Sequence, residues 1–160
     1  MRERLAVVWH FIRGRYLQRF RTRKALRRYQ KRRVLGQLTY LKEHSPYFKG
    51  LSVHSFADFK KLPLMNKGFM MEHFNALNCV GIDRDEALSL AIDSEKQREF
   101  SEKLGGISVG LSSGTSGARG LFLVSDRERA LWAGTVLAKF LPKGRLFGHR
   151  IAFFLRADNN

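Results

Sequence analysis

The chain has 160 residues, and its 30 Lys and Arg against 14 Asp and Glu give a formal net charge of +16. A hydrophobic content of 44% with 13 Phe is sufficient for a packed core, which excludes a wholly disordered chain. No apolar run reaches the roughly 18 residues that a membrane-spanning helix needs, and residues 5–12 are too short and lack the cleavage site of a secretory signal.

The positive charge is concentrated at the N-terminus. Residues 1–50 carry 15 Lys and Arg against 2 Asp and Glu, a net charge of +13, whereas residues 51–160 carry 15 against 12, a net charge of +3. Apolar residues at helical spacing predict helix over residues 1–42, in two pieces joined near Gly14, and Pro46 ends this region. Residues 1–49 therefore form a basic amphipathic helical segment. Three roles remain open: packing on its own domain, docking to an anionic membrane surface through residues 1–42, and binding nucleic acid, which no recognised module supports.

Short polar side chains mark the starts of the later helices. Ser55 with Asp58 predicts a short helix that stops at Pro63, and Asp83 predicts a helix that continues to about Leu104. Two further N-caps are predicted at Asn66 and at Ser125, which forms a capping box with Glu128 for a helix to about Leu141.

Three apolar segments are predicted to be strands: residues 107–111, 121–124 and 150–155. The second and third flank the helix that begins after Ser125, so they form a βαβ unit with parallel strands and a right-handed crossover. The sequence therefore predicts the α/β class, with helices covering a mostly parallel sheet.

The segment between the first two strands, LSSGTSGARG from Leu111 to Gly120, combines glycines with hydroxyl side chains. Glycine reaches positive φ without steric cost, so successive N–H groups can converge on one anion, and Ser and Thr add donors without bulk. This loop lacks the G-x-x-x-x-G-K-[ST] pattern, because no Lys follows its last glycine and a strand comes next. The pattern favours a phosphate-binding loop over a flexible turn. Its predicted phosphate-binding residues are Ser112, Ser113, Gly114, Thr115, Ser116, Gly117 and Arg119.

The loop resembles the first signature of the adenylate-forming superfamily, which includes acyl-CoA synthetases. The similarity is greatest to phenylacetate–CoA ligases, capsular-polysaccharide-type adenylating proteins and synthetases that adenylylate a deazaflavin coenzyme. It extends upstream through HSPYF (44–48) and through residues 59–67, which are similar to the family stretch "dl..lP.l.K". Many members continue G-x-P-K-G, whereas this chain has Ala118-Arg119-Gly120. Arg119 is therefore the candidate substitute for the missing lysine.

This resemblance implies the N-terminal part of the large domain of an ATP-dependent ligase, with residues 50–160 as the first part of an adenylation domain. The loop would hold the β- and γ-phosphates of ATP, and a carboxylate or hydroxyl substrate would be joined to AMP with release of pyrophosphate. The ligands of Mg²⁺ and the other catalytic signatures would lie beyond residue 160, so we expect an N-terminal fragment that is inactive alone. A non-enzymatic basic module that docks through residues 1–42 is the alternative.

The remaining candidates are weaker. Arg156 and Asn159 follow a predicted parallel strand, where open α/β sheets place substrates, although a polar loop is the competing interpretation. The histidines lack metal-ligand spacing, so no metal site is expected among them. The single cysteine, Cys79, excludes an internal disulfide and indicates a reducing, cytoplasmic compartment; its apolar neighbours favour a small buried side chain over a reactive thiol.

Overall fold

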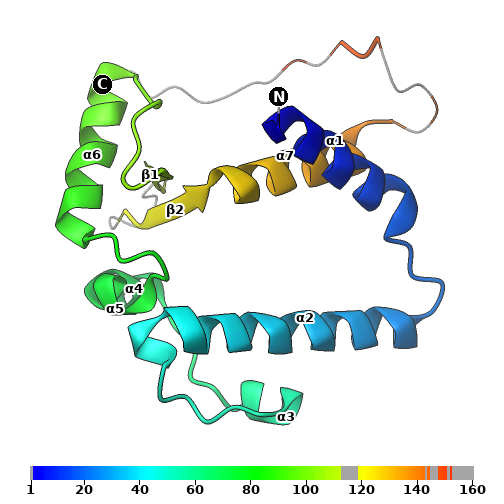
Figure 1. The fold of residues 1–160 in the computed structure, drawn as a ribbon, viewed down its shortest axis with the longest axis horizontal. Coiled ribbons are helices and arrows are strands. Elements are labelled where there is room, and N and C mark those ends of the chain that lie inside the picture. Colours follow the sequence, from blue (N-terminus) through cyan, green and yellow to red (C-terminus); the bar gives the residue numbers. More distant parts are fainter. Residues whose placement is uncertain (1, 113–118, 143, 145–147, 151, 153–160) are drawn as a thin grey trace.

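The computed structural model describes residues 2–112, 119–142, 144, 148–150 and 152, and within them the chain is of the α/β class (Figure 1). Its elements in chain order are α1 (Arg2–Ile12), a π-helical turn η1 (Arg13–Leu17), α2 (Arg23–His44), a 3-10 turn η2 (Pro46–Phe48), α3 (Phe56–Phe59), α4 (Lys67–Glu72), α5 (Phe74–Leu77), α6 (Arg84–Gln97), β1 (Ile107–Leu111), β2 (Leu121–Ser125) and α7 (Asp126–Phe140).

The predicted helix starts are confirmed. The side chains of Ser55 and Ser125 each accept a hydrogen bond from the backbone N–H three residues on, and both positions have complete capping boxes. Asn66 Oδ1 accepts from Phe69 N at 2.9 Å, and Asp83 Oδ1 accepts from Asp85 N at 2.8 Å. Local side-chain chemistry therefore fixes where α3, α4, α6 and α7 begin.

Two helix boundaries differ from the prediction. The break between α1 and α2 lies at residues 18–22, because Gly14 is accommodated within the π-helical turn η1. Helix α6 ends at Gln97 rather than near Leu104, since Arg98 adopts a left-handed conformation (φ 55°) and its N–H bonds to Glu95 O and Ser94 O. Lys103 therefore lies beyond the end of α6, and its Nζ lies 2.6 Å from Asp126 Oδ1 at the start of α7.

The described residues form a two-stranded antiparallel sheet, β1–β2, in which Val109 pairs with Leu123. The predicted, mostly parallel sheet is not seen in them, and the expected parallel partner, residues 150–155, lies largely outside them. The ring of Phe122 packs over its cross-strand partner Gly110: an added Cβ there would lie 2.3 Å from Cζ of Phe122, so a side chain at position 110 would have to displace this ring.

Helix α1 packs against α7, far from it in sequence (Figure 1). A Cβ at Gly134 would lie 2.5 Å from Val7 O and 2.7 Å from His10 Cβ, so the absence of a side chain permits the two helices to approach closely. Beyond this crossing, Arg15 donates hydrogen bonds to Ala138 O (3.1 Å), to Leu141 O (2.6 Å) and to Pro142 O, which satisfies carbonyls at the C-terminal end of α7.

The rest of the chain surrounds a small buried core. Leu38 of α2, Phe74 of α5, Val53 and Ile82 are buried, and Ser45 Oγ, also buried, donates to Ala76 O at 2.9 Å. Small residues occupy the buried positions of two helices: Ala87, Ala91 and Ser94 on α6, and Ala130, Gly134 and Ala138 on α7. Figure 1 shows α6 and α2 on two sides of the strands, with β2 leading directly into α7.

Candidate functional site

The predicted phosphate loop connects the end of β1 to the start of β2. Hydrogen bonds between Ser112 and Gly120 close the base of this loop, which we call its neck. Ser112 N donates to Gly120 O at 2.8 Å, and Gly120 N donates back to Ser112 Oγ at 2.8 Å. One backbone bond and one bond to a side chain thus hold the two loop ends together just beyond the last ladder pair, Leu111 and Leu121. Residues 113–118 lie outside the described residues, so among the predicted phosphate ligands the structure locates Ser112 and Arg119, one at each end of the loop.

Arg119 is held across the neck. Its Nε donates to Ser112 O at 3.2 Å, and its Nη2 lies 2.5 Å from Glu95 Oε1 on α6. Hydrogen bonding to Glu95 raises the pKa of Arg119 above its ordinary value, so the guanidinium is permanently charged. About two fifths of each side chain is exposed, at 44% for Arg119 and 37% for Glu95, which leaves the pair within reach of a ligand.

A second basic residue, Lys67, lies at the same neck. A Cβ added to Gly120 would meet Cγ and Cδ of Lys67 at 3.4 Å, so the aliphatic part of this side chain packs on the loop end. Lys67 is the first residue of α4, whose cap is Asn66, and Met71 on the same helix accepts a contact from Leu121 N at 3.3 Å through its sulfur. Lys67 is not among the phosphate-binding residues that the loop pattern predicts; the signal for it in the sequence is its place at the end of the upstream stretch, residues 59–67, that resembles the family.

The neck therefore brings together elements that are distant in sequence: α4 supplies Lys67, β2 begins at the loop end that carries Arg119, and α6 supplies Glu95. Two cations beside a glycine- and hydroxyl-rich loop suit a polyphosphate, because charged donors strengthen hydrogen bonds to anionic oxygens. The carboxylate of Glu95 opposes anion binding, because it neutralises the positive charge of Arg119. An anion at the loop would compete with Glu95 for the guanidinium.

The other predicted residues are placed as follows. Arg156 and Asn159 lie outside the described residues. His44 stacks on Tyr40 with ring centroids 4.1 Å apart, and His73 stacks on Phe69 at 4.2 Å, so both rings have packing roles. Within the described ranges, no group of three or more His, Cys, Asp and Glu side chains has an arrangement suited to a metal ion.

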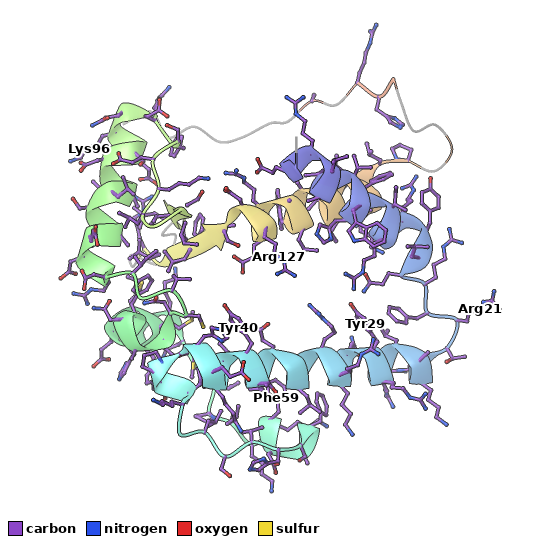
Figure 2. All side chains as sticks on the ribbon, in the orientation of Figure 1. Arg21, Tyr29, Tyr40, Phe59, Lys96 and Arg127 are labelled. Atoms are coloured by element: carbon purple, nitrogen blue, oxygen red, sulfur yellow. The ribbon has the colours of Figure 1, made fainter. Side chains whose placement is uncertain are left out.

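A separate cleft of about 530 Å³ lies between α2, the sheet and the start of α7. It is lined by Tyr40 and Arg33 of α2, by Arg127 of α7 and by Cys79; Figure 2 shows Tyr40 on the side of α2 that faces α7, with Arg127 opposite. Cys79 is half-buried, and burial, followed by the negative charge of Glu128, raises the pKa of its thiol. A raised pKa lowers the thiolate fraction, which opposes reactivity.

Comparison with known proteins gives no match: no protein-family model, curated protein or solved structure is significantly similar to this chain. Among the helices of the described residues, none has both the length and the apolar character required to cross a bilayer.

Proposed function

We propose that this chain binds the polyphosphate of ATP through residues 112–117 and forms the N-terminal part of an ATP-dependent adenylate-forming ligase. The observation that carries the proposal is the closed strand–loop–strand neck, at which Lys67 and Arg119 lie beside a loop rich in glycine and hydroxyl groups. The family resemblance of the SSGTSG segment supplies the reaction class, in which a carboxylate or hydroxyl substrate is joined to AMP and pyrophosphate leaves.

In this proposal the chain contributes positioning and electrostatic stabilisation. The hydroxyls of Thr115 and Ser116 and the backbone N–H groups around Gly114 donate to the β- and γ-phosphates, and Arg119 exchanges part of its contact with Glu95 for a phosphate oxygen. ATP would arrive as its Mg²⁺ complex in the cytoplasm. Fixed donors of this kind stabilise charge that develops on phosphate oxygens without reorganisation during the reaction.

Calorimetric titration of Mg²⁺–ATP into the wild type and into Thr115→Ala/Ser116→Ala tests the assignment. Hydrogen bonds to charged groups contribute about 1.5–3 kcal/mol each, so we expect the double variant to bind at least tenfold more weakly. The matched control is Thr39→Ala/Ser52→Ala, which removes the same two side-chain types from exposed positions outside the loop. Equal affinity of the wild type and the loop variant would remove these residues from the site.

A non-enzymatic basic module is the second candidate, and the concentration of charge in residues 1–50 favours it. The two functions are compatible in one chain. They separate experimentally, because a module of this kind would retain binding to anionic surfaces in the Thr115→Ala/Ser116→Ala variant and would show no ATP affinity in the wild type.

A further inference from the structure

Helix α1 has two apolar faces, of which α7 covers one. Val7, His10 and Phe11 lie against Gly134. Successive residues of a helix are about 100° apart, which places the second apolar set on the opposite side of α1. This outer face consists of Leu5, Val8, Trp9 and Ile12, with exposed fractions of 64%, 53%, 55% and 39%.

The contacts of α1 with α7 keep the outer face turned towards solvent. Near the start of α1, Glu3 Oε1 lies 2.6 Å from Arg129 Nη2. Arg15, in the turn η1 that follows α1, donates hydrogen bonds to carbonyls at the C-terminal end of α7. With both ends fixed and the inner face packed on Gly134, rotation of α1 to bury Trp9 would break all of these contacts. The outer face therefore remains available to a partner.

The apolar surface continues past α1 into a basic hollow. A depression of about 280 Å³ is lined by Trp9, Leu17 and Phe20 together with Arg13 and Arg19, so apolar and cationic side chains share one surface. Beyond it, all nine Lys and Arg between positions 19 and 33 are exposed, and this interval contains no Asp or Glu. Within the described part of the chain, residues 13–33 make no ion pair with an acidic side chain.

We propose that this surface docks on an anionic lipid bilayer, with α1 lying flat in the interface. The outer-face side chains would enter the boundary between headgroups and acyl chains, and Arg13 and Arg19 would meet lipid phosphates beside the hollow. An 11-residue helix is about 16 Å long, too short to span a hydrocarbon core of about 30 Å. An interfacial orientation is the one that this length permits.

The combination of positive charge and apolar area on this surface favours a bilayer over nucleic acid as its partner. The phosphates of a nucleic acid would pair with the arginines. The four apolar side chains of the outer face would still be exposed to water or phosphate, so their burial would contribute no binding free energy. A bilayer of anionic lipids offers a broad acidic plane with an apolar layer directly beneath it, which matches both parts of the surface. This inference does not depend on the loop at residues 112–117, so ATP titration and lipid binding succeed or fail separately.

Sedimentation with vesicles of phosphatidylcholine alone and with added phosphatidylserine tests the proposal. The wild type is expected to bind the phosphatidylserine vesicles, to release them at high salt and to leave pure phosphatidylcholine vesicles unbound. Leu5→Ser/Trp9→Ser is expected to reduce the partition coefficient at least tenfold. Its matched control, Leu64→Ser/Trp132→Ser, removes the same residue types from positions that are also exposed, and is expected to bind as the wild type does.

A charge variant and a spectroscopic readout complete the test. Arg13→Gln/Arg19→Gln should lower the salt dependence of vesicle binding, whereas Lys60→Gln/Lys61→Gln should leave it unchanged. In a Trp132→Phe background, the emission of Trp9 should shift to the blue on phosphatidylserine vesicles. Circular dichroism checks that each variant is folded. The proposal would be overturned if Leu5→Ser/Trp9→Ser and Leu64→Ser/Trp132→Ser lost vesicle binding to the same extent. It would also be overturned if the wild type bound duplex DNA and did not bind the vesicles.

Discussion

Gly134 lies directly against the backbone of Val7: a Cβ at position 134 would be 2.5 Å from Val7 O, closer than any side-chain carbon can approach. This contact decides how α1 is held on α7, and through it which face of α1 remains exposed. At Gly134 the inner face of α1 approaches α7 through the backbone of Val7 and Phe11 and through Cβ of His10.

Gly134→Ala is expected to destabilise the protein, because the added methyl group meets backbone atoms that cannot move independently. Overpacking of this kind costs about 1–3 kcal/mol in the free energy of unfolding, measured by urea denaturation. Gly36→Ala is the matched control, since a Cβ there meets nothing within 4 Å and α2 gains helix propensity. If both variants are stabilised, the close approach of α1 and α7 does not exist in solution.

The cap of α6 predicts an acid-sensitive contribution to stability. Hydrogen bonds from Glu86 N, the Asn75 side chain and Asp85 N lower the pKa of Asp83 below its ordinary value of 3.8. Because the folded state binds the proton more weakly than the unfolded state, this contribution is present above the unfolded pKa and is lost as the pH falls through the lower, folded pKa. Asp83→Asn keeps a cap but cannot titrate.

Urea unfolding from about pH 5 to pH 2 checks this expectation. The wild type should lose more stability over this range than Asp83→Asn does. Asp58 and Asp126 also have lowered pKa values, so the variant should retain a reduced acid-dependent loss rather than none. Identical pH profiles for the two proteins would contradict the role of the Asp83 carboxylate.

Cys79 is expected to react slowly with alkylating agents at neutral pH. Burial and the nearby charge of Glu128 raise the pKa of its thiol, so less thiolate is present than in a free thiol. Rates of iodoacetamide modification from about pH 7 to pH 10 measure this directly, with glutathione as reference. Glu128→Gln should increase the rate, because it removes the charge while glutamine can still complete the capping box at Ser125. A thiol faster than glutathione at neutral pH would refute the assignment.

The Glu95–Arg119 pair predicts opposite effects of two substitutions on Mg²⁺–ATP binding. Glu95→Gln frees Arg119 and removes a negative charge near the proposed phosphate site, so we expect affinity to rise severalfold. Arg119→Gln should weaken it. Since both side chains are partly exposed, loss of their pair should change the free energy of unfolding by no more than about 1 kcal/mol.

Asp85→Asn is the matched control for this pair, because it breaks the exposed Arg84–Asp85 ion pair at the other end of the same helix. It should leave the affinity for Mg²⁺–ATP unchanged. If Glu95→Gln and Asp85→Asn behave alike, Arg119 does not act on the bound anion.

Short-range chemistry explains why much of the secondary structure is predictable. Ser55, Asn66, Asp83 and Ser125 cap helices through bonds to N–H groups two or three residues away, so their effect requires no knowledge of the fold. The strands around the loop follow equally from apolar runs bounded by glycine. The end of α6 does not follow from the sequence, because the left-handed conformation at Arg98 has no strong local signal: most residues that adopt it are glycine or asparagine.

By itself, therefore, the sequence determined the α/β class, the helix starts and the loop between two strands, since each depends on neighbours along the chain. Only the tertiary structure decided that Glu95 compensates Arg119, that Lys67 packs on Gly120, and that Gly134 receives the inner face of α1. These contacts join positions separated by many residues, and their partners are selected by shape and charge in space, which no local pattern encodes.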